Sequence, residues 1–265
     1  MQQIEHLVDT LHLEDLQNDL HPSIFDDNDD YDMLIVRLPV IAEKLKAISL
    51  GFIITKESSY LFNSVTNRLE ELESRFEGPH NTIDRLLDQL LKSFHSYQDQ
   101  ISDMEERLYE DRVKTNFMTQ WLTLKRDILR IERIMHRTSS VMKDMINYYE
   151  TDGSFPMNHY IDIHEHCERI LRSATLQLSK LDYLYNFYNT RTNEKMNRLI
   201  FLLTIISAVF LPLNLIVGFF GMNTSGLPFT KGADGTLNVV VGLVLLVVIT
   251  SLAVLLWRRK IEDAE

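Results

Sequence analysis

Two long stretches near the C-terminal end of the sequence consist almost wholly of apolar residues. Residues 199–220 and 237–257 contain no Asp, Glu, Lys, Arg or His. A helix needs about 20 apolar residues to cross a bilayer, and a helix in a soluble core rarely continues that far without a charge. The pattern therefore predicts two transmembrane helices, 199–220 and 237–257, and excludes a simple soluble protein.

Basic residues next to the two apolar runs predict the orientation of the chain, because positive charge accumulates on the cytoplasmic side. The flanking basic residues are Arg191, Lys195, Arg198, Arg258, Arg259 and Lys260. The connecting loop, 221–236, contains one basic residue, Lys231. We therefore expect an external loop at 221–236, a basic cytoplasmic tail at 258–265, and both termini in the cytoplasm.

Ahead of the membrane runs, apolar residues recur with helical spacing. Segments 82–112 and 115–150 predict two long antiparallel helices. From Asn158 no proline occurs before Pro212, so one helix is predicted over 158–220, about 95 Å long at 1.5 Å per residue. The apolar stripes contain Leu86, Leu90, Phe94, Tyr97 and Ile101; Leu122, Leu129 and Met135; and Ile163, Cys167, Ile170, Ala174, Leu181, Tyr185 and Tyr188. A helix as long as 158–220 requires partner helices, as in a bundle or coiled coil.

Residues 1–77 predict a small α/β domain, and residues 78–157 contain the helical pair. A weak helical pattern covers 2–20, and the β-branched and aromatic segments 33–39, 49–55 and 59–63 predict short strands. Several acidic residues precede the first strand, and we interpret them as a solvated loop, with cation sensing as the alternative. They are Asp26, Asp27, Asp29, Asp30 and Asp32.

Polar and small residues lie on one face of the first apolar run. They are Asn197, Thr204, Ser207, Leu211, Asn214, Gly218 and Gly221, with spacings of 7, 3, 4, 3, 4 and 3. Small and polar residues favour close contacts between membrane helices, so this face either packs against other helices or lines a water-filled pore. A chain with two spans cannot enclose a pore alone, so the second interpretation requires a homo-oligomer.

Charge and cysteine content exclude other classes of protein. The formal net charge is -11, and residues 199–265 contribute none of it. An acidic chain is repelled by phosphates, so no nucleic-acid partner is expected, whereas cations are attracted. The single Cys167 excludes an internal disulfide, and no nucleotide-binding loop or nucleophile motif predicts an enzyme. The start, MQQIEHLVDT, lacks the pattern of a signal peptide.

A short motif at the end of the first run adds a family resemblance. Phe220-Gly221-Met222-Asn223 directly follows a predicted membrane helix and precedes a short loop and a second span. With Leu203-Thr204 and Phe210-Leu211-Pro212-Leu213 upstream, it resembles the CorA superfamily of divalent-cation channels. LHLEDLQN (11–18) and FDDNDDYDMLIVRLP (25–39) resemble the cytoplasmic domain of that family.

The resemblance implies a mostly α-helical homopentamer in the bacterial inner membrane. Each subunit would contribute an α/β cytoplasmic domain with a shortened start, a funnel of long helices and two transmembrane helices. The first of these helices would line the pore, and Gly221, Met222 and Asn223 would form its outer mouth. Asp162 corresponds to a position that binds a regulatory ion in magnesium-transporting members.

Two departures from the magnesium branch favour zinc as the transported ion. Asn214 replaces a usual threonine, and Phe229 replaces the glutamate that usually follows the loop proline. The run Ser225-Gly226-Leu227-Pro228 resembles the ZntB-like zinc branch. We therefore expect zinc transport, with magnesium, cobalt or nickel as the alternative within the family, and a membrane-anchored sensor or scaffold without flux as the alternative outside it.

The predicted pore face offers amide and hydroxyl oxygens but no carboxylate, His or Cys. Neutral groups cannot replace the tightly held water of Mg²⁺, but they accept hydrogen bonds from that water. A ring of Asn223 amides would therefore bind a hydrated cation at the outer mouth. Ile200, Leu203 and Leu211 lie on or beside this face, and apolar rings there would gate the pore by excluding water.

Four residues near the start of the long helix are potential zinc ligands. They are His159, His164, His166 and Cys167. Zinc requires three or four converging ligands, and helical spacing directs His166 away from His164 and Cys167. We therefore expect no shared metal site among these four, no resident cofactor, and a buried packing role for Cys167.

Overall fold

The computed structural model describes residues 7–42, 44–112, 116–221 and 235–262. The chain forms two compact units, Met1–Asn186 and Phe187–Glu265. The first unit combines a β-sheet with long helices, and the second consists of the remainder of the longest helix and one further helix.

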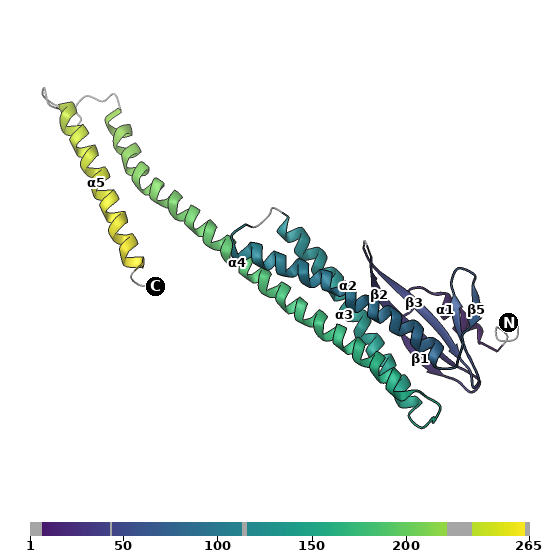
Figure 1. Cartoon of the computed structure of the whole chain (residues 1–265). Coiled ribbons are helices and arrows are strands. Elements are labelled where there is room, and N and C mark those ends of the chain that lie inside the picture. Colours follow the sequence, from purple (N-terminus) through teal and green to yellow (C-terminus); the bar gives the residue numbers. More distant parts are fainter. Residues whose placement is uncertain (1–6, 43, 113–115, 222–234, 263–265) are drawn as a thin grey trace. The chain divides into compact units, whose positions relative to one another are not determined.

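The sheet of the first unit has five antiparallel strands in the order β1-β2-β3-β4-β5 (Figure 1). The strands are β1 (Ile24–Asp27), β2 (Asp32–Ile41), β3 (Leu45–Ile54), β4 (Ser59–Asn63) and β5 (Arg68–Glu71). Each strand pairs with the next along the chain, and Leu34 lies opposite Phe52 in the longest pairing. This meander requires only short turns, because antiparallel neighbours can be joined directly.

One face of the sheet carries the short helix α1 (Thr10–Gln17). Asp9 caps this helix, since its Oδ1 accepts a hydrogen bond from the backbone N–H of Leu11 at 2.8 Å. Leu16 approaches the sheet so closely that a Cβ added at Gly51 would lie 2.3 Å from Leu16 Cδ2. The buried core on this side contains Val8, Leu16, Tyr31, Met33, Ile35, Ile53 and Leu69.

The opposite face of the sheet packs against α2 (Glu77–Tyr109) and α3 (Phe117–Tyr148), which both contact β2. Successive strand residues point to opposite faces, so Leu34, Val36 and Leu38 turn toward these helices. Thr138 of α3 donates a hydrogen bond to the carbonyl of Arg37 at 2.8 Å, which joins the helix to the middle of β2.

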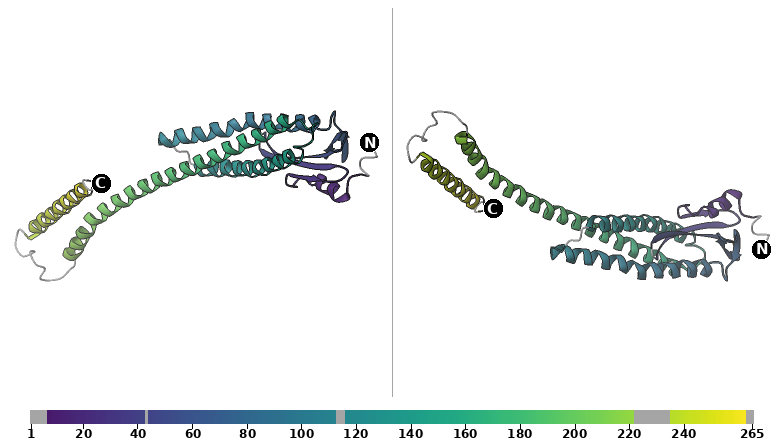
Figure 2. Two further views of the ribbon diagram at one scale, coloured as in Figure 1. Left: turned by 90° about the horizontal axis from the view of Figure 1, so that it is seen from below. Right: turned by 90° about the horizontal axis from the view of Figure 1, so that it is seen from above.

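The helices α2, α3 and the first part of α4 (Met157–Gly221) lie side by side (Figures 1 and 2). Trp121 of α3 donates its indole N–H to the carbonyl of Leu181 in α4 at 2.8 Å and stacks on Tyr185 with 4.7 Å between ring centroids. Gln98 of α2 donates to Ser173 Oγ of α4 at 2.9 Å. Buried apolar stripes and these polar contacts together hold the three helices as a bundle.

The predicted strands 33–39, 49–55 and 59–63 are confirmed as the central strands of the sheet. The solvated-loop interpretation is wrong at both ends of the acidic segment, because Asp26 and Asp27 belong to β1 and Asp32 begins β2. The segment lacks the alternation of a strand, and its strand conformation comes from pairing with β2.

The two helices predicted over 82–112 and 115–150 are confirmed with shifted ends, as α2 and α3. The helix predicted over 158–220 is a single helix, Met157–Gly221. Four stripe positions are shifted by one residue, and two of them are Leu129 and Tyr185, which are only partly buried beside the fully buried Ile128 and Leu184. Leu122 is 57% exposed, and Trp121 is buried in its place. Leu87 is fully buried, whereas its neighbour Leu86 is only partly buried. Adjacent apolar residues satisfy the helical spacing almost equally well, so the pattern alone did not distinguish them.

In the second unit, α4 contains a segment that is long and apolar enough to cross a membrane, and none of that segment is buried. The other helix is α5 (Gly235–Glu262), whose described apolar part, Val240–Thr250, is shorter. The first predicted span therefore coincides with a helix of sufficient length, and the second lies within α5.

Candidate functional site

The polar and small residues of the first apolar run share one face of an unbroken helix. At 100° per residue, Asn197, Thr204 and Gly221 lie within a sector of about 120° that also contains the other predicted positions. The full set is Asn197, Ile200, Leu203, Thr204, Ser207, Leu211, Asn214, Gly218 and Gly221. This face therefore extends along the whole apolar part of α4.

Apolar side chains of this part of α4 are open to the surroundings. Leu203 and Leu211 are 64% and 68% exposed, and a Cβ placed on Gly218 or Gly221 would meet no atom within 4 Å in the part of the chain that the structure describes. So large an apolar surface is unfavourable in water and requires lipid or other helices to cover it. The helix is thus suited to a bilayer, to contact with further copies, or to both.

The hydroxyl of Thr204 is oriented by its own helix. Its Oγ1 donates a hydrogen bond to the carbonyl of Ile200 at 2.8 Å. The single hydroxyl proton is therefore used, whereas the oxygen still has lone pairs with which to accept hydrogen bonds. The Thr204 oxygen therefore interacts best with a hydrogen-bond donor, such as a water molecule bound to a cation.

Pro212 lies inside α4 without ending it. Proline has no N–H, so the carbonyl of Ala208 loses its usual partner four residues on. Membrane helices accommodate this loss through neighbouring groups and water. The helix then continues to Gly221, its last residue.

The predicted outer mouth lies largely outside the described residues. Met222 and Asn223 follow α4 directly, and Phe229 belongs to the same segment, 222–234, which the structure does not describe. Only Gly221 of the Gly-Met-Asn motif is described, at the end of α4. The roles of Met222 and Asn223 stay predictions.

In the first unit, Asp162 lies near an acid that the sequence did not reveal. Asp162 Oδ1 is 3.8 Å from His166 Nε2, and the other ring nitrogen of His166 is 3.6 Å from Asp84 Oδ1 on α2. These three side chains form one group of potential metal ligands. Asp84 precedes Asp162 by 78 positions, so no local spacing could have linked them.

The other potential ligands near the start of α4 have different surroundings. His164 contacts Ser139 of α3 at 3.2 Å, whereas His159 contacts Glu77 of α2. Cys167 is fully buried, and burial raises the pKa of its thiol to about 12. The predicted packing role of Cys167 is confirmed, because a thiol that stays protonated is a poor metal ligand.

The acidic segment contains a buried carboxyl rather than only solvated ones. Asp32 accepts a hydrogen bond from the hydroxyl of Tyr149, the C-cap residue that directly follows α3. Burial is the main effect and raises the pKa of Asp32 above its usual 3.8, although Tyr149 and Arg75 act in the opposite direction. Asp32 is therefore engaged inside the fold, which does not favour the cation-sensing alternative for this residue.

The raised pKa gives a stability prediction for Asp32. A carboxyl whose pKa is higher in the folded state costs stability once it is ionised, and this cost disappears as the pH falls through the folded pKa to 3.8. We expect Asp32→Asn to raise the unfolding temperature at pH 7 by about 1–3 °C. The difference should vanish below pH 3.8, and a lower unfolding temperature at pH 7 would contradict the assignment.

Comparison with known protein families places residues 1–260 in one family. The family model described as "CorA-like Mg2+ transporter protein" matches residues 1–260. The structure resembles the complete structure of the CorA magnesium transporter from Methanocaldococcus jannaschii, with a TM-score of 0.75, 14% identity, and 95% and 84% of the two chains covered. It also resembles the full-length CmaX protein, with a TM-score of 0.72, 16% identity, and 95% and 81% coverage.

Curated relatives are similar at comparable levels but differ in the ion for which they are named. The divalent cation transporter CmaX of Pseudomonas aeruginosa is 26% identical over 212 residues, 76% of this chain and 59% of CmaX. The zinc transport protein ZntB of Vibrio parahaemolyticus is 23% identical over 184 residues, 69% and 57% of the two chains. The cobalt/magnesium transport protein CorA of Thermotoga maritima is 24% identical over 153 residues, 56% and 42%.

These identities do not distinguish a zinc branch from a magnesium branch. The matched part of the chain spans less than two thirds of the length of each of these curated relatives. The match over residues 1–260 nevertheless includes the sheet, the bundle and the apolar part of α4. The chain therefore belongs to the CorA-like Mg²⁺ transporter family, a family of membrane transporters and not of enzymes.

Proposed function

We propose that this protein moves hydrated divalent cations, with zinc favoured, through a homo-oligomeric pore lined by the apolar part of α4. The observation that carries the proposal is the sector of small and polar residues along an apolar helix that nothing covers in the described chain. Family membership supports the proposal, since the family is one of divalent-cation transporters.

The apolar part of α4 would form the first membrane span and α5 the second. The basic residues on both sides of this pair would then lie in the cytoplasm, with the loop 221–236 outside. In this arrangement the first unit, with its excess of acidic residues, attracts cations on the cytoplasmic side. A bacterial inner membrane is the proposed location, as the family resemblance implies.

A pore requires several copies of α4, because two spans cannot surround a channel. Five copies follow from the family resemblance. Identical faces would then form stacked rings, with polar rings at Thr204 and Asn214 and apolar rings at Leu203 and Leu211. The domain divisions proposed from the sequence fit this assembly: 1–77, 78–157, 158–220, 221–236, 237–257 and 258–265.

The chemistry of this face favours a cation that keeps its water. Water bound to a cation directs its hydrogens outward, so the pore must offer acceptors. The Thr204 oxygen is oriented as an acceptor, and the Asn214 amide contains another. Neither is a carboxylate, so the rings hold the hydrated ion weakly and let it leave, as conduction requires.

The preference for zinc rests on one residue of the loop and one residue of α4. Phe229 stands where the magnesium branch usually has a glutamate, and Asn214 where it usually has threonine. Magnesium, with cobalt or nickel, is the alternative ion. We expect Phe229→Glu to increase cation capture, and thus the initial uptake rate at low concentration, for Zn²⁺ and Mg²⁺ alike. An increased uptake rate for only one of the two ions would contradict an uncharged outer mouth of the pore.

Uptake into liposomes tests the function directly. Vesicles that contain only this protein would be given Zn²⁺, Mg²⁺, Co²⁺ and Ni²⁺ side by side, with protein-free vesicles as the control. We expect saturable uptake with Zn²⁺ fastest. Rapid Mg²⁺ uptake without Zn²⁺ uptake would reverse the ion preference, and no uptake of any ion would favour the sensor or scaffold.

A further inference from the structure

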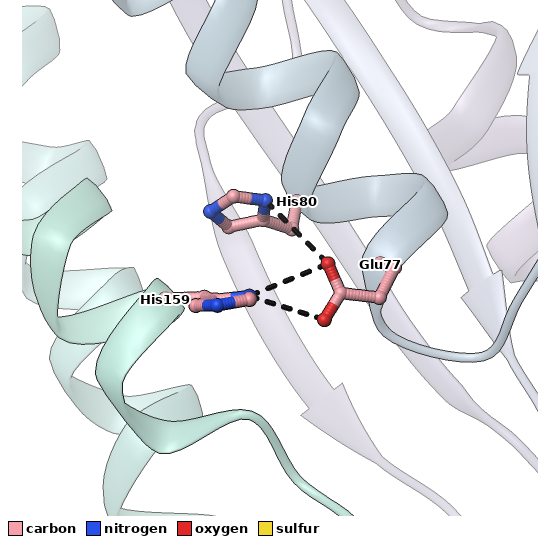
Figure 3. Close-up of side chains that lie close together, drawn as sticks. All are labelled: Glu77, His80 and His159. Carbon is pink, nitrogen blue, oxygen red and sulfur yellow. Dashed lines mark hydrogen bonds and ion pairs between the residues drawn. The ribbon is translucent and has the colours of Figure 1, made fainter.

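A second group of potential metal ligands lies in the first unit, between the starts of two helices. Glu77 is the first residue of α2, His80 follows one turn later, and His159 belongs to the first turn of α4. Figure 3 shows both imidazole rings next to the Glu77 carboxylate, one above the other. Residues 82 positions apart in the sequence are thus brought into contact.

The distances suit a small cation. His159 Nδ1 lies 3.1 Å from Glu77 Oε1, and His80 Nδ1 lies 4.0 Å from Glu77 Oε2. One ligand atom from each residue lies within 4.8 Å of the other two. Metal–ligand bonds of about 2.0–2.2 Å place tetrahedral ligands about 3.3–3.6 Å apart. Small side-chain rotations would therefore close the three ligands around one ion.

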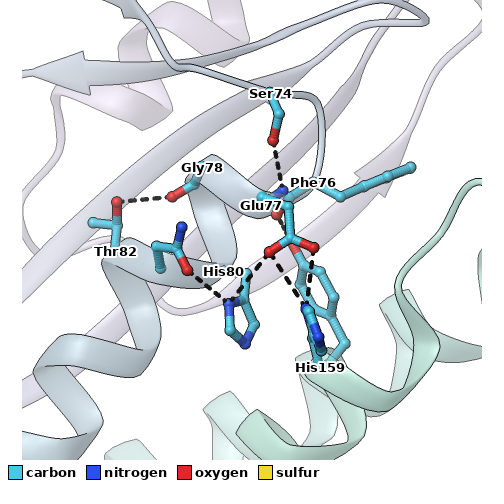
Figure 4. A network of polar contacts seen from close by, with 9 residues as sticks. Ser74, Phe76, Glu77, Gly78, His80, Thr82 and His159 are labelled. Atoms are coloured by element: carbon cyan, nitrogen blue, oxygen red, sulfur yellow. Dashed lines mark hydrogen bonds and ion pairs between the residues drawn. The ribbon is translucent and has the colours of Figure 1, made fainter.

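The backbone on both sides of this group is held in place. Tyr160, next to His159, is fully buried and donates its hydroxyl to the carbonyl of Phe76 at 2.9 Å. On α2, the N–H of Glu77 donates to Ser74 Oγ at 3.0 Å (Figure 4). The start of α4 is therefore fixed against the residue that precedes Glu77, and the ligands are presented from a rigid frame.

Charge favours a cation over a simple ion pair. The His80 and His159 rings lie 5.0 Å apart between centroids and share one carboxylate. Two imidazole nitrogens and one carboxylate form a three-ligand set, and the carboxylate attracts a divalent cation.

The ligand types distinguish between metals. Imidazole nitrogen with a carboxylate oxygen is a common zinc set, whereas Mg²⁺ prefers oxygen ligands and keeps several waters. The side chains of Glu77 and His159 are 46% and 53% exposed, and that of His80 is 13% exposed. The group is thus open to solvent on one side, which gives an ion access and leaves a position for water.

We propose that Glu77, His80 and His159 bind a zinc-class divalent cation and thereby join the start of α2 to the start of α4. This site is separate from the proposed pore-lining face of α4. It would bind the metal directly through nitrogen and carboxylate ligands, whereas the pore-lining face offers neutral oxygens. It is also separate from the group formed by Asp84, Asp162 and His166.

Zinc binding to the purified full-length protein tests this site without any transport measurement. Protein stripped of metal with a chelator would compete for Zn²⁺ with a chromophoric indicator. We expect His159→Ala and Glu77→Gln each to weaken zinc binding at least about tenfold, since each removes one of three ligands. His95→Ala, which alters an exposed histidine elsewhere on α2, is the matched control and should bind like wild type.

Two further variants separate this site from the other places where zinc can bind. Asn214→Leu alters the proposed pore, and His166→Ala alters the neighbouring ligand group. The proposal expects both to retain wild-type affinity, and X-ray absorption of the bound zinc to show two imidazoles. It is overturned if the stripped protein binds no zinc, if His159→Ala and Glu77→Gln bind like wild type, or if His166→Ala alone loses the ion.

Discussion

Replacing Asn223 with alanine is expected to reduce divalent-cation uptake by about tenfold or more while the protein still assembles. The change removes an amide from every subunit at the proposed outer mouth, and each hydrogen bond to the hydrated ion contributes about 1 kcal/mol, where 1.4 kcal/mol is a factor of ten. The measurement is the initial uptake rate in liposomes, with the oligomer verified by gel filtration in detergent.

Two neighbouring variants control this prediction. Asn223→Gln keeps the amide on a longer side chain and should retain part of the uptake. Thr224→Ala removes a polar group one position along and should have little effect. Unchanged uptake by assembled Asn223→Ala protein would rule out the proposed role of this amide.

Replacing Asn214 with leucine is expected to block uptake almost completely. Asn214 lies in the polar sector of α4, and a ring of leucines there would adjoin the apolar ring at Leu211 and exclude water from a longer part of the pore. Ile216→Leu is the matched control, because Ile216 lies on the opposite side of the helix at a similar depth. Uptake measured in the same liposomes should be unaffected by this control.

Cysteine crosslinking shows directly whether Asn214 faces other subunits. Asn214→Cys should form disulfides between chains on mild oxidation, and Ile216→Cys should not. The native Cys167 will not interfere, because it is buried and its thiol pKa is raised to about 12. Crosslinking at 216 but not at 214 would place the polar sector away from the pore axis.

Strong periodic patterns made most of this fold predictable. The β-branched and aromatic residues of segments such as 33–39 predicted the central strands, and the helical stripes predicted three long helices. The strands β1 and β5 were missed, because IFDD and RLEE are too short and too polar to show a pattern. Their conformation comes from pairing with neighbouring strands, a tertiary effect that local propensity does not contain.

The site was predictable only where it lies within one helix. The polar and small residues from Asn197 to Gly221 lie in consecutive turns of α4, so their spacing in the sequence was sufficient to define the pore-lining face. The groups in the first unit depend on how α2 packs against α4. Glu77 and His80 have the spacing of one helical turn, but nothing local pairs them with His159, and nothing pairs Asp84 with Asp162.

The most direct test of the central claim is zinc uptake by this protein in liposomes with and without cobalt hexaammine. This complex resembles a hydrated divalent ion in size and in its outward-facing hydrogens, but it does not release its ligands. If the ion crosses with its water along a neutral α4 face, cobalt hexaammine on the side of the loop 221–236 should block zinc uptake. Zinc uptake that cobalt hexaammine leaves unchanged, while Asn223→Ala still strongly reduces it, would contradict passage of the hydrated ion.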